Sequence, residues 1–108
     1  MFIEAPESVA EMERIGRTFD APLLANLVEG GRTPVLPKRD LEAIGYKIAI
    51  FPAAGFLAAG AALRAVYSAL SETGSTAGYE GPLYDFSDFT KLMGFERVWA
   101  FERANAEG

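Results

Sequence analysis

Three short apolar runs, each followed by a segment with helical spacing, constrain the fold of this chain more than any other feature. The runs cover residues 1–4, 23–27 and 46–51. Apolar residues then recur at helical spacing over residues 8–19, 37–44 and 53–73. The second run does not alternate with polar residues, which is typical of a parallel strand covered on both faces. Because crossovers between parallel strands are right-handed, the order predicts an α/β fold with one parallel sheet.

The predicted sheet is small for an independent domain of this class. Three parallel strands leave both edges of the sheet open. A complete (β/α)8 barrel has ~250 residues, whereas this chain has 108. The chain also begins inside a strand, as an internal methionine mistaken for a start, or a truncated gene, would produce. We therefore predict three βα units of a TIM barrel over residues 1–74, followed by a linker and helical tail over residues 75–108.

Local signals predict where the helices begin and end. Ser8 stands before the first helix with Glu11 three residues later, which predicts a capping box. Gly45 suits the left-handed residue that ends a helix, and Gly94 separates two short helices in the tail. One face of the first helix is predicted to be buried, and it consists of Val9, Met12, Ile15 and Phe19.

The composition excludes several kinds of chemistry. The chain contains neither cysteine nor histidine, so thiolate chemistry and a histidine base are excluded. A metal site made by this chain would have oxygen ligands. The net charge of −5, with scattered basic residues, argues against binding to nucleic acid. The absence of cysteine fits a cytoplasmic location.

One uncharged stretch, residues 48–63, could be mistaken for a membrane span. It is shorter than the ~20 residues that a spanning helix needs, and Pro52 divides it. The start of the chain lacks the basic and apolar regions of a signal peptide. We therefore predict a buried strand followed by an alanine-rich buried helix, and no membrane partner.

Polar side chains follow two neighbouring strands of the predicted sheet. Glu4 ends the first strand, Asn26 lies at the end of the second, and Glu29 comes just beyond it. Active sites of parallel α/β proteins lie at the carboxyl ends of the strands. Because adjacent strands lie ~4.8 Å apart, Glu4 and Asn26 could face one small ligand. A carboxylate beside an amide can both accept and donate hydrogen bonds to an oxygenated substrate.

Structural roles for the same residues remain open at this point. Glu4 could pair with a helix cap or an arginine, and Asn26 could form an Asx-turn. The loop over residues 29–33 could hold an anion on its backbone amides. Its glycines are explained more simply by turn geometry.

Two motifs carry a resemblance to a known family. Residues 2–8 read FIEAPES and resemble the F-x-E-A-P-x-S segment after the sixth barrel strand of the isocitrate lyase/phosphoenolpyruvate mutase superfamily. Residues 22–31 read PLLANLVEGG and resemble its P-L-L-A-N-M-x-E-G-G segment after the seventh. Residues 50–52 resemble the end of the eighth strand. The resemblance implies the C-terminal part of a TIM barrel, and it is close over residues 1–74 and loose in the tail.

The resemblance also implies a chemistry. Members of the family bind Mg²⁺ and stabilise an enolate of a small α-keto acid, and many cleave a C–C bond in acids of the 2-methylisocitrate, dimethylmalate or oxaloacetate type. Others are phosphonomutases. By this resemblance Glu4 is a catalytic residue that faces the active site. Asn26 holds a carboxylate of a small carboxylic-acid substrate, and Glu29 lies in the loop above as a further substrate-binding residue.

The departures from the family pattern lie in what this stretch lacks. The paired aspartates that hold the metal, the loop with a Lys-Cys-Gly-His-type segment and the carboxylate-binding arginine have no match here. We therefore expect Mg²⁺ in the intact enzyme, with ligands outside this chain, and expect the chain alone to be inactive. The alternatives are a non-catalytic partial barrel that acts only as an assembling or structural module and, less favoured, a flavodoxin-like binding domain.

Aromatic residues are concentrated in the tail, and two explanations are open. The set consists of Tyr84, Phe86, Phe89, Phe95, Trp99 and Phe101. We expect them to pack on the neighbouring helix; a subunit contact is the alternative. Because family members exchange the helix after the last strand between subunits, we also expect a homo-oligomer when the protein is full length.

Overall fold

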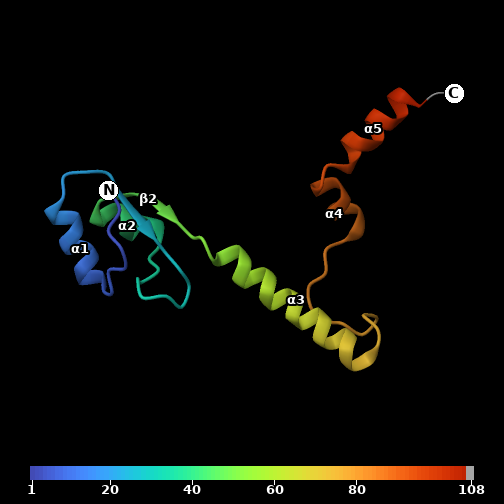
Figure 1. Ribbon diagram of the computed structural model, residues 1–108, viewed down its shortest axis with the longest axis horizontal. Coiled ribbons are helices and arrows are strands. Elements are labelled where there is room, and N and C mark those ends of the chain that lie inside the picture. Colours follow the sequence, from blue (N-terminus) through green and yellow to red (C-terminus); the bar gives the residue numbers. More distant parts are fainter. Residues whose placement is uncertain (107–108) are drawn as a thin grey trace. The chain divides into compact units, whose positions relative to one another are not determined.

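The computed structural model describes residues 1–106 and divides into two compact units, Met1–Leu63 and a second that begins at Arg64. The elements in chain order are α1 (Val9–Thr18), β1 (Leu23–Asn26), α2 (Lys38–Ile44), β2 (Tyr46–Ile50), α3 (Ala54–Thr73), α4 (Phe86–Leu92) and α5 (Phe95–Asn105). From α1 onward the predicted order of strands and helices is confirmed, and α1, α2 and the strands form one compact group (Figure 1).

The sheet is parallel, as predicted, but it has two strands rather than three. β1 pairs with β2 in a parallel register that places Asn26 opposite Ile50. The first predicted strand is reduced to a single parallel bridge between Phe2 and Leu24, where the Leu24 N–H donates to the Met1 carbonyl at 2.9 Å. The prediction of a full strand over residues 1–4 is wrong because this segment pairs on one side only and at one position. The spatial order Phe2 segment, β1, β2 still follows the chain.

The start of α1 has the predicted cap with one change. The Ser8 hydroxyl accepts a hydrogen bond from the Glu11 N–H at 3.2 Å. The Glu11 carboxylate accepts from the N–H of Glu7, at 2.7 Å, rather than from that of the cap residue. The hydrogen bond to the Glu11 carboxylate therefore comes from the residue before the cap, one position earlier than in a standard capping box. This bond connects the loop before α1 to the helix.

The core of the first unit lies between the sheet and the helices α1 and α2. It consists of Met12, Leu23, Ala25, Leu27, Leu41 and Tyr46, with Ile15, Leu36 and Ile44 packed against it. Burial raises the pKa of the Tyr46 phenol above its ordinary value, so this hydroxyl stays neutral at physiological pH.

Only part of the predicted apolar face of α1 is buried. Met12 is fully buried and Ile15 packs on the core, but Val9 and Phe19 are exposed. The prediction was wrong for the two ends of the helix because α2 covers only its middle. At that crossing Gly16 lies directly against Ile44, since a methyl group at Gly16 would overlap the Ile44 carbonyl oxygen.

Helix α3 contains no buried residue, which contradicts the predicted buried helix. Its leucines and Phe56 are exposed. By length and composition α3 could also cross a membrane, a test that the core helices of many proteins pass. The predicted absence of a membrane partner therefore stays a prediction.

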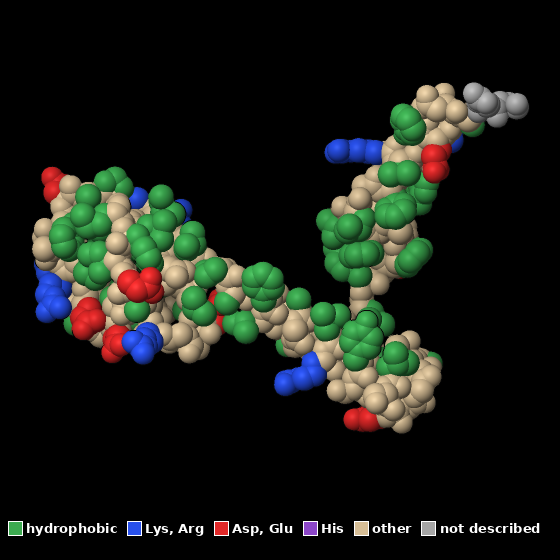
Figure 2. Space-filling view, viewed as in Figure 1, with side chains coloured by type: hydrophobic (Ala, Val, Ile, Leu, Met, Phe, Trp, Pro, Cys, Tyr) green, Lys and Arg blue, Asp and Glu red, His purple; other side chains and the backbone are tan. Residues whose placement is uncertain are grey.

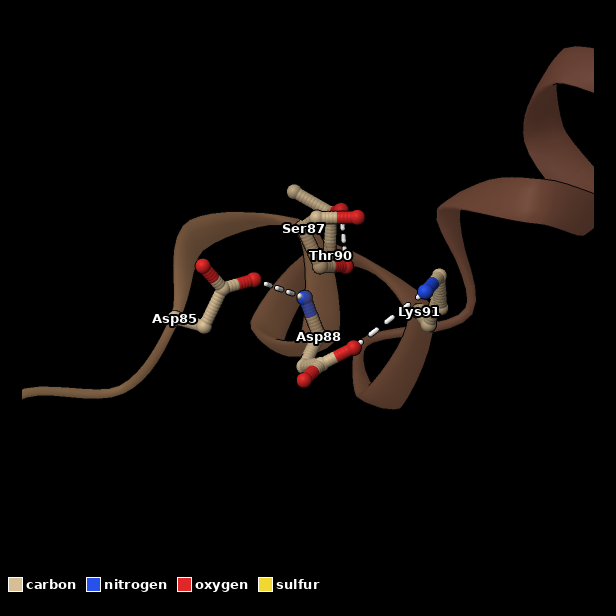
Figure 3. Close-up of polar contacts among 5 residues, drawn as sticks. All are labelled: Asp85, Ser87, Asp88, Thr90 and Lys91. Atoms are coloured by element: carbon tan, nitrogen blue, oxygen red, sulfur yellow. Dashed lines mark hydrogen bonds and ion pairs between the residues drawn. The ribbon is translucent and has the colours of Figure 1, made fainter.

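The two tail helices are separated at Gly94 as predicted, with Gly94 in the left-handed region at φ 81°. α4 is held by local contacts (Figure 3): the Asp85 carboxylate accepts from the Asp88 N–H at 3.0 Å, and Lys91 pairs with Asp88 at 3.2 Å. The Thr90 hydroxyl donates to the carbonyl of Ser87. Residues 107–108 of the predicted tail lie outside the described residues.

The tail aromatics stay on the surface, as the hydrophobic side chains over α4 and α5 in Figure 2 show. Four of the six rings pack in pairs. The ring centroids of Tyr84 and Phe89 lie 5.6 Å apart, and those of Phe95 and Trp99 lie 5.9 Å apart. Within the second unit all six aromatic residues are exposed, so the expected burial of this group against a neighbouring helix is not observed there.

Candidate active site

Glu4 and Asn26 line one open pocket at the carboxyl ends of the Phe2 segment and β1. The pocket has a volume of about 410 Å³, and Ala5, Val28, Gly31, Arg32 and Thr33 complete its wall. The sheet explains the juxtaposition, because parallel neighbours end at the same edge. The structure thus brings together the two residues that the strand-end argument selected.

The side chain of Asn26 carries an unsatisfied polar atom. Its Oδ1 is buried and, among the described residues, has no hydrogen-bond partner. The predicted alternative of an Asx-turn needs that oxygen as an acceptor, so the structure does not support it. A buried acceptor without a partner costs about 1–3 kcal/mol, and a ligand that donates a hydrogen bond here would remove this cost.

The backbone next to Glu4 is in an unusual conformation. Ala5 has a φ of 47°, in the left-handed region that a residue with a Cβ seldom adopts. Such strain costs about 1–3 kcal/mol and clusters at ligand-binding positions. In the described part of the chain Glu4 makes no ion pair, whereas the nearby Arg32 pairs with Glu7 at 3.4 Å. The alternative in which Glu4 pairs with an arginine is therefore not observed.

Glu29 lies apart from this pair. A turn closes between Val28 and Gly31, whose N–H donates to the Val28 carbonyl at 2.9 Å, and Gly30 adopts a φ of 74°. This turn exposes Glu29, which does not line the pocket. The glycines serve turn geometry, and because the Gly31 amide is already engaged, it is not available to an anion.

The sequence pointed to Arg32 and Thr33 only through the backbone amides of the loop over residues 29–33, and their side chains were not predicted to line the pocket. Their signal was present, because both follow the turn after β1 and such a turn directs the next residues back over the strand ends. Arg32 supplies positive charge to the same pocket wall as Glu4, so the described wall contains one acidic and one basic side chain. The pocket can therefore donate to and accept from a small acid.

The described residues do not fit a divalent metal ion. Within residues 1–106, no group of three or more acidic side chains lies close enough to hold a metal ion. Glu4 is the one carboxylate among the described residues that line the pocket. A magnesium site needs more oxygen ligands than this wall offers.

The match to solved structures defines the class of protein. Oxaloacetate acetylhydrolase in complex with oxalate superposes on 98% of this chain and 36% of its own, with a TM-score of 0.81 and 22% identity, which bears on the fold alone. 2,3-Dimethylmalate lyase, described as a PEP mutase/isocitrate lyase superfamily member, superposes on 95% of this chain and 36% of its own, with a TM-score of 0.76 and 25% identity. The fold is thus that of part of a (β/α)8 barrel.

The sequence comparisons name the family. The chain is 44% identical to 2,3-dimethylmalate lyase of Eubacterium barkeri over all 108 residues, which span 37% of that protein. It is 35% identical to 2-methylisocitrate lyase of Aeropyrum pernix over 107 residues, or 34% of that protein. The chain belongs to the isocitrate lyase/phosphoenolpyruvate mutase superfamily. It spans about a third of the length of these relatives. No family model matches it.

Proposed function

We propose that the complete protein is a Mg²⁺-dependent carboxylic-acid lyase that acts through an enolate of a small α-keto acid. The observation that carries the proposal is the pocket wall that Glu4 shares with Asn26, a residue whose buried Oδ1 has no partner among the described residues. The reaction class, a carbon–carbon lyase, is supported by two relatives named 2,3-dimethylmalate lyase and 2-methylisocitrate lyase.

The two side chains suit a hydroxy acid. The Oδ1 of Asn26 can accept from a substrate hydroxyl while its amide group donates to a carboxylate. The Glu4 carboxylate can accept a proton or a hydrogen bond at the same ligand. Because the described residues do not form a metal site, the Mg²⁺ of the proposal would be held by residues outside this chain.

The complete polypeptide is expected to release an α-keto acid from a 2-methylisocitrate- or dimethylmalate-type acid. The measurement couples α-keto acid release to the oxidation of NADH by added lactate dehydrogenase, with Mg²⁺ and then with EDTA. Oxaloacetate is assayed separately by the appearance of oxalate. Loss of activity with EDTA and its return with added Mg²⁺ support the proposal. A folded, complete protein that converts none of these acids would contradict it.

A second candidate is the non-catalytic partial barrel that assembles with another chain. The observation that favours it is the exposure of apolar side chains on and after β2, namely Ile48, Ile50 and Phe51. A chain of this kind would form a discrete, stable oligomer by itself and would convert none of the acids above. Sedimentation of the 108-residue chain tests this candidate, and an aggregated or unfolded chain would reject it.

We also propose that the complete enzyme is a homo-oligomer in which α3 packs on a second subunit. The support is that α3, an apolar helix, contains no buried residue, since an uncovered apolar helix is costly in water. We expect light scattering at micromolar concentration to give a multiple of the subunit mass. A monomeric mass would contradict this assembly.

A further inference from the structure

Arg32 is the basic side chain of the described pocket wall, and its charge is already engaged. Its Nη1 lies 3.4 Å from the Glu7 carboxylate. Glu7 does not line the pocket, whereas Arg32 does. The guanidinium therefore lies at the border of the pocket, between a carboxylate outside it and the space that a ligand would fill.

The ion pair is weak enough to be exchanged. The side chains of Arg32 and Glu7 are 77% and 63% exposed, and surface ion pairs of this kind contribute about 0–1 kcal/mol. An arginine that forms two parallel hydrogen bonds with a carboxylate in a less exposed site gains more. A carboxylate bound in the pocket would therefore compete successfully with Glu7.

The two partners differ in how firmly they are held. The Glu7 N–H donates to the Glu11 carboxylate at 2.7 Å, which ties Glu7 to the capped start of α1. Arg32 follows the turn at Gly30 and Gly31, and its long side chain is 77% exposed. Exchange of the pair would therefore move Arg32 and leave Glu7 in place.

We propose that Arg32 is a charge-selecting residue that pairs with Glu7 in the empty pocket and transfers to a carboxylate of the bound acid. This inference rests on the proposed function. Its physical basis is the charge of the wall, where Glu4 would repel a bound carboxylate unless a cation faces it. Glu7 then acts as a positioning residue that holds the guanidinium at the border of the pocket, at a cost in affinity for the acid.

The test uses the complete protein and oxalate, a small acid with two carboxylates, as the probe in titration calorimetry. Arg32→Gln is expected to weaken oxalate binding about tenfold or more, because a charge-assisted hydrogen bond is lost. Glu7→Gln is expected to tighten binding by up to about fivefold, because the competing carboxylate is gone. In the double variant the effect of Glu7→Gln is expected to vanish. Thermal unfolding of each variant controls for folding, since both side chains are exposed.

The opposite effects expected for Arg32→Gln and Glu7→Gln distinguish a charge-selecting Arg32 from an ion pair that only holds two loops together. If the pair only held two loops together, both single variants would weaken binding to the same extent, and that result overturns the proposal. Asn26→Ala separates a failure of the role proposed for Arg32 from a failure of the proposed function. Weaker binding in Asn26→Ala with unchanged binding in Arg32→Gln would reject the role of Arg32 and leave the proposed function standing. Unchanged binding in Asn26→Ala, or no oxalate binding by the folded wild type, would reject the proposed function itself and Arg32 with it.

Discussion

Glu4→Gln in the complete enzyme is expected to lower kcat/KM by about a hundredfold or more, the range for the loss of a positioned acid or base. The substitution keeps the size of the side chain and its capacity for hydrogen bonds but removes its charge. Because Glu4 is exposed and makes no ion pair in the described chain, the free energy of unfolding should change by less than about 0.5 kcal/mol. Steady-state kinetics with the acid that the wild type converts would measure the effect.

Asn26→Ala tests the other half of the pocket in the same assay. It removes the buried oxygen without a partner, so we expect stability to be kept, while kcat/KM falls by a factor of about 10²–10³. Glu13→Gln is the matched control, because it makes the same carboxylate-to-amide change on the exposed surface of α1, where Glu13 pairs with Arg17. Unchanged kcat/KM in both Glu4→Gln and Asn26→Ala would remove these residues from the proposed mechanism.

The predictions that succeeded rest on local signals. β1, α2 and β2 lie within a residue or two of their predicted limits because apolar periodicity and a left-handed Gly45 act over a few neighbouring residues. The meeting of Glu4 and Asn26 followed from one further rule, that parallel strands end at a common edge.

The predictions that failed concern burial, which depends on the elements that pack against an apolar face. Periodicity showed which face of α1 is apolar, but the exposure of Val9 and Phe19 depends on where α2 crosses it. The same holds for α3 and the tail aromatics, whose apolar faces have no cover among the described residues. A strand over residues 1–4 likewise needs a neighbour on its other side. Glu29, which follows β1 and precedes the left-handed Gly30, is exposed and does not line the pocket, so its predicted role in substrate binding stays a prediction.

Stability and the site are coupled through Leu27, which directly follows Asn26. Leu27 is fully buried in the core, and its N–H donates to the Ile50 carbonyl at 2.9 Å, which continues the pairing of β1 with β2. The packing of Leu27 therefore holds the end of β1 where Asn26 borders the pocket. A cavity at Leu27 would loosen the same strand end that presents the Asn26 amide.

Leu27→Ala in the 108-residue chain is accordingly expected to lower the free energy of unfolding by about 2–5 kcal/mol, as other buried leucines do when cut back to alanine. A loss of that size is a large fraction of the 5–15 kcal/mol of a typical domain, so we expect a measurable unfolded fraction of the variant at 25 °C. Urea unfolding followed by far-ultraviolet circular dichroism would measure it. Leu57→Ala is the matched control, because Leu57 is 51% exposed on α3, and we expect a change within about 0.5 kcal/mol. Equal small losses in both variants would show that the chain in solution lacks the core in which Leu27 is buried, and that Asn26 is then not held beside Glu4.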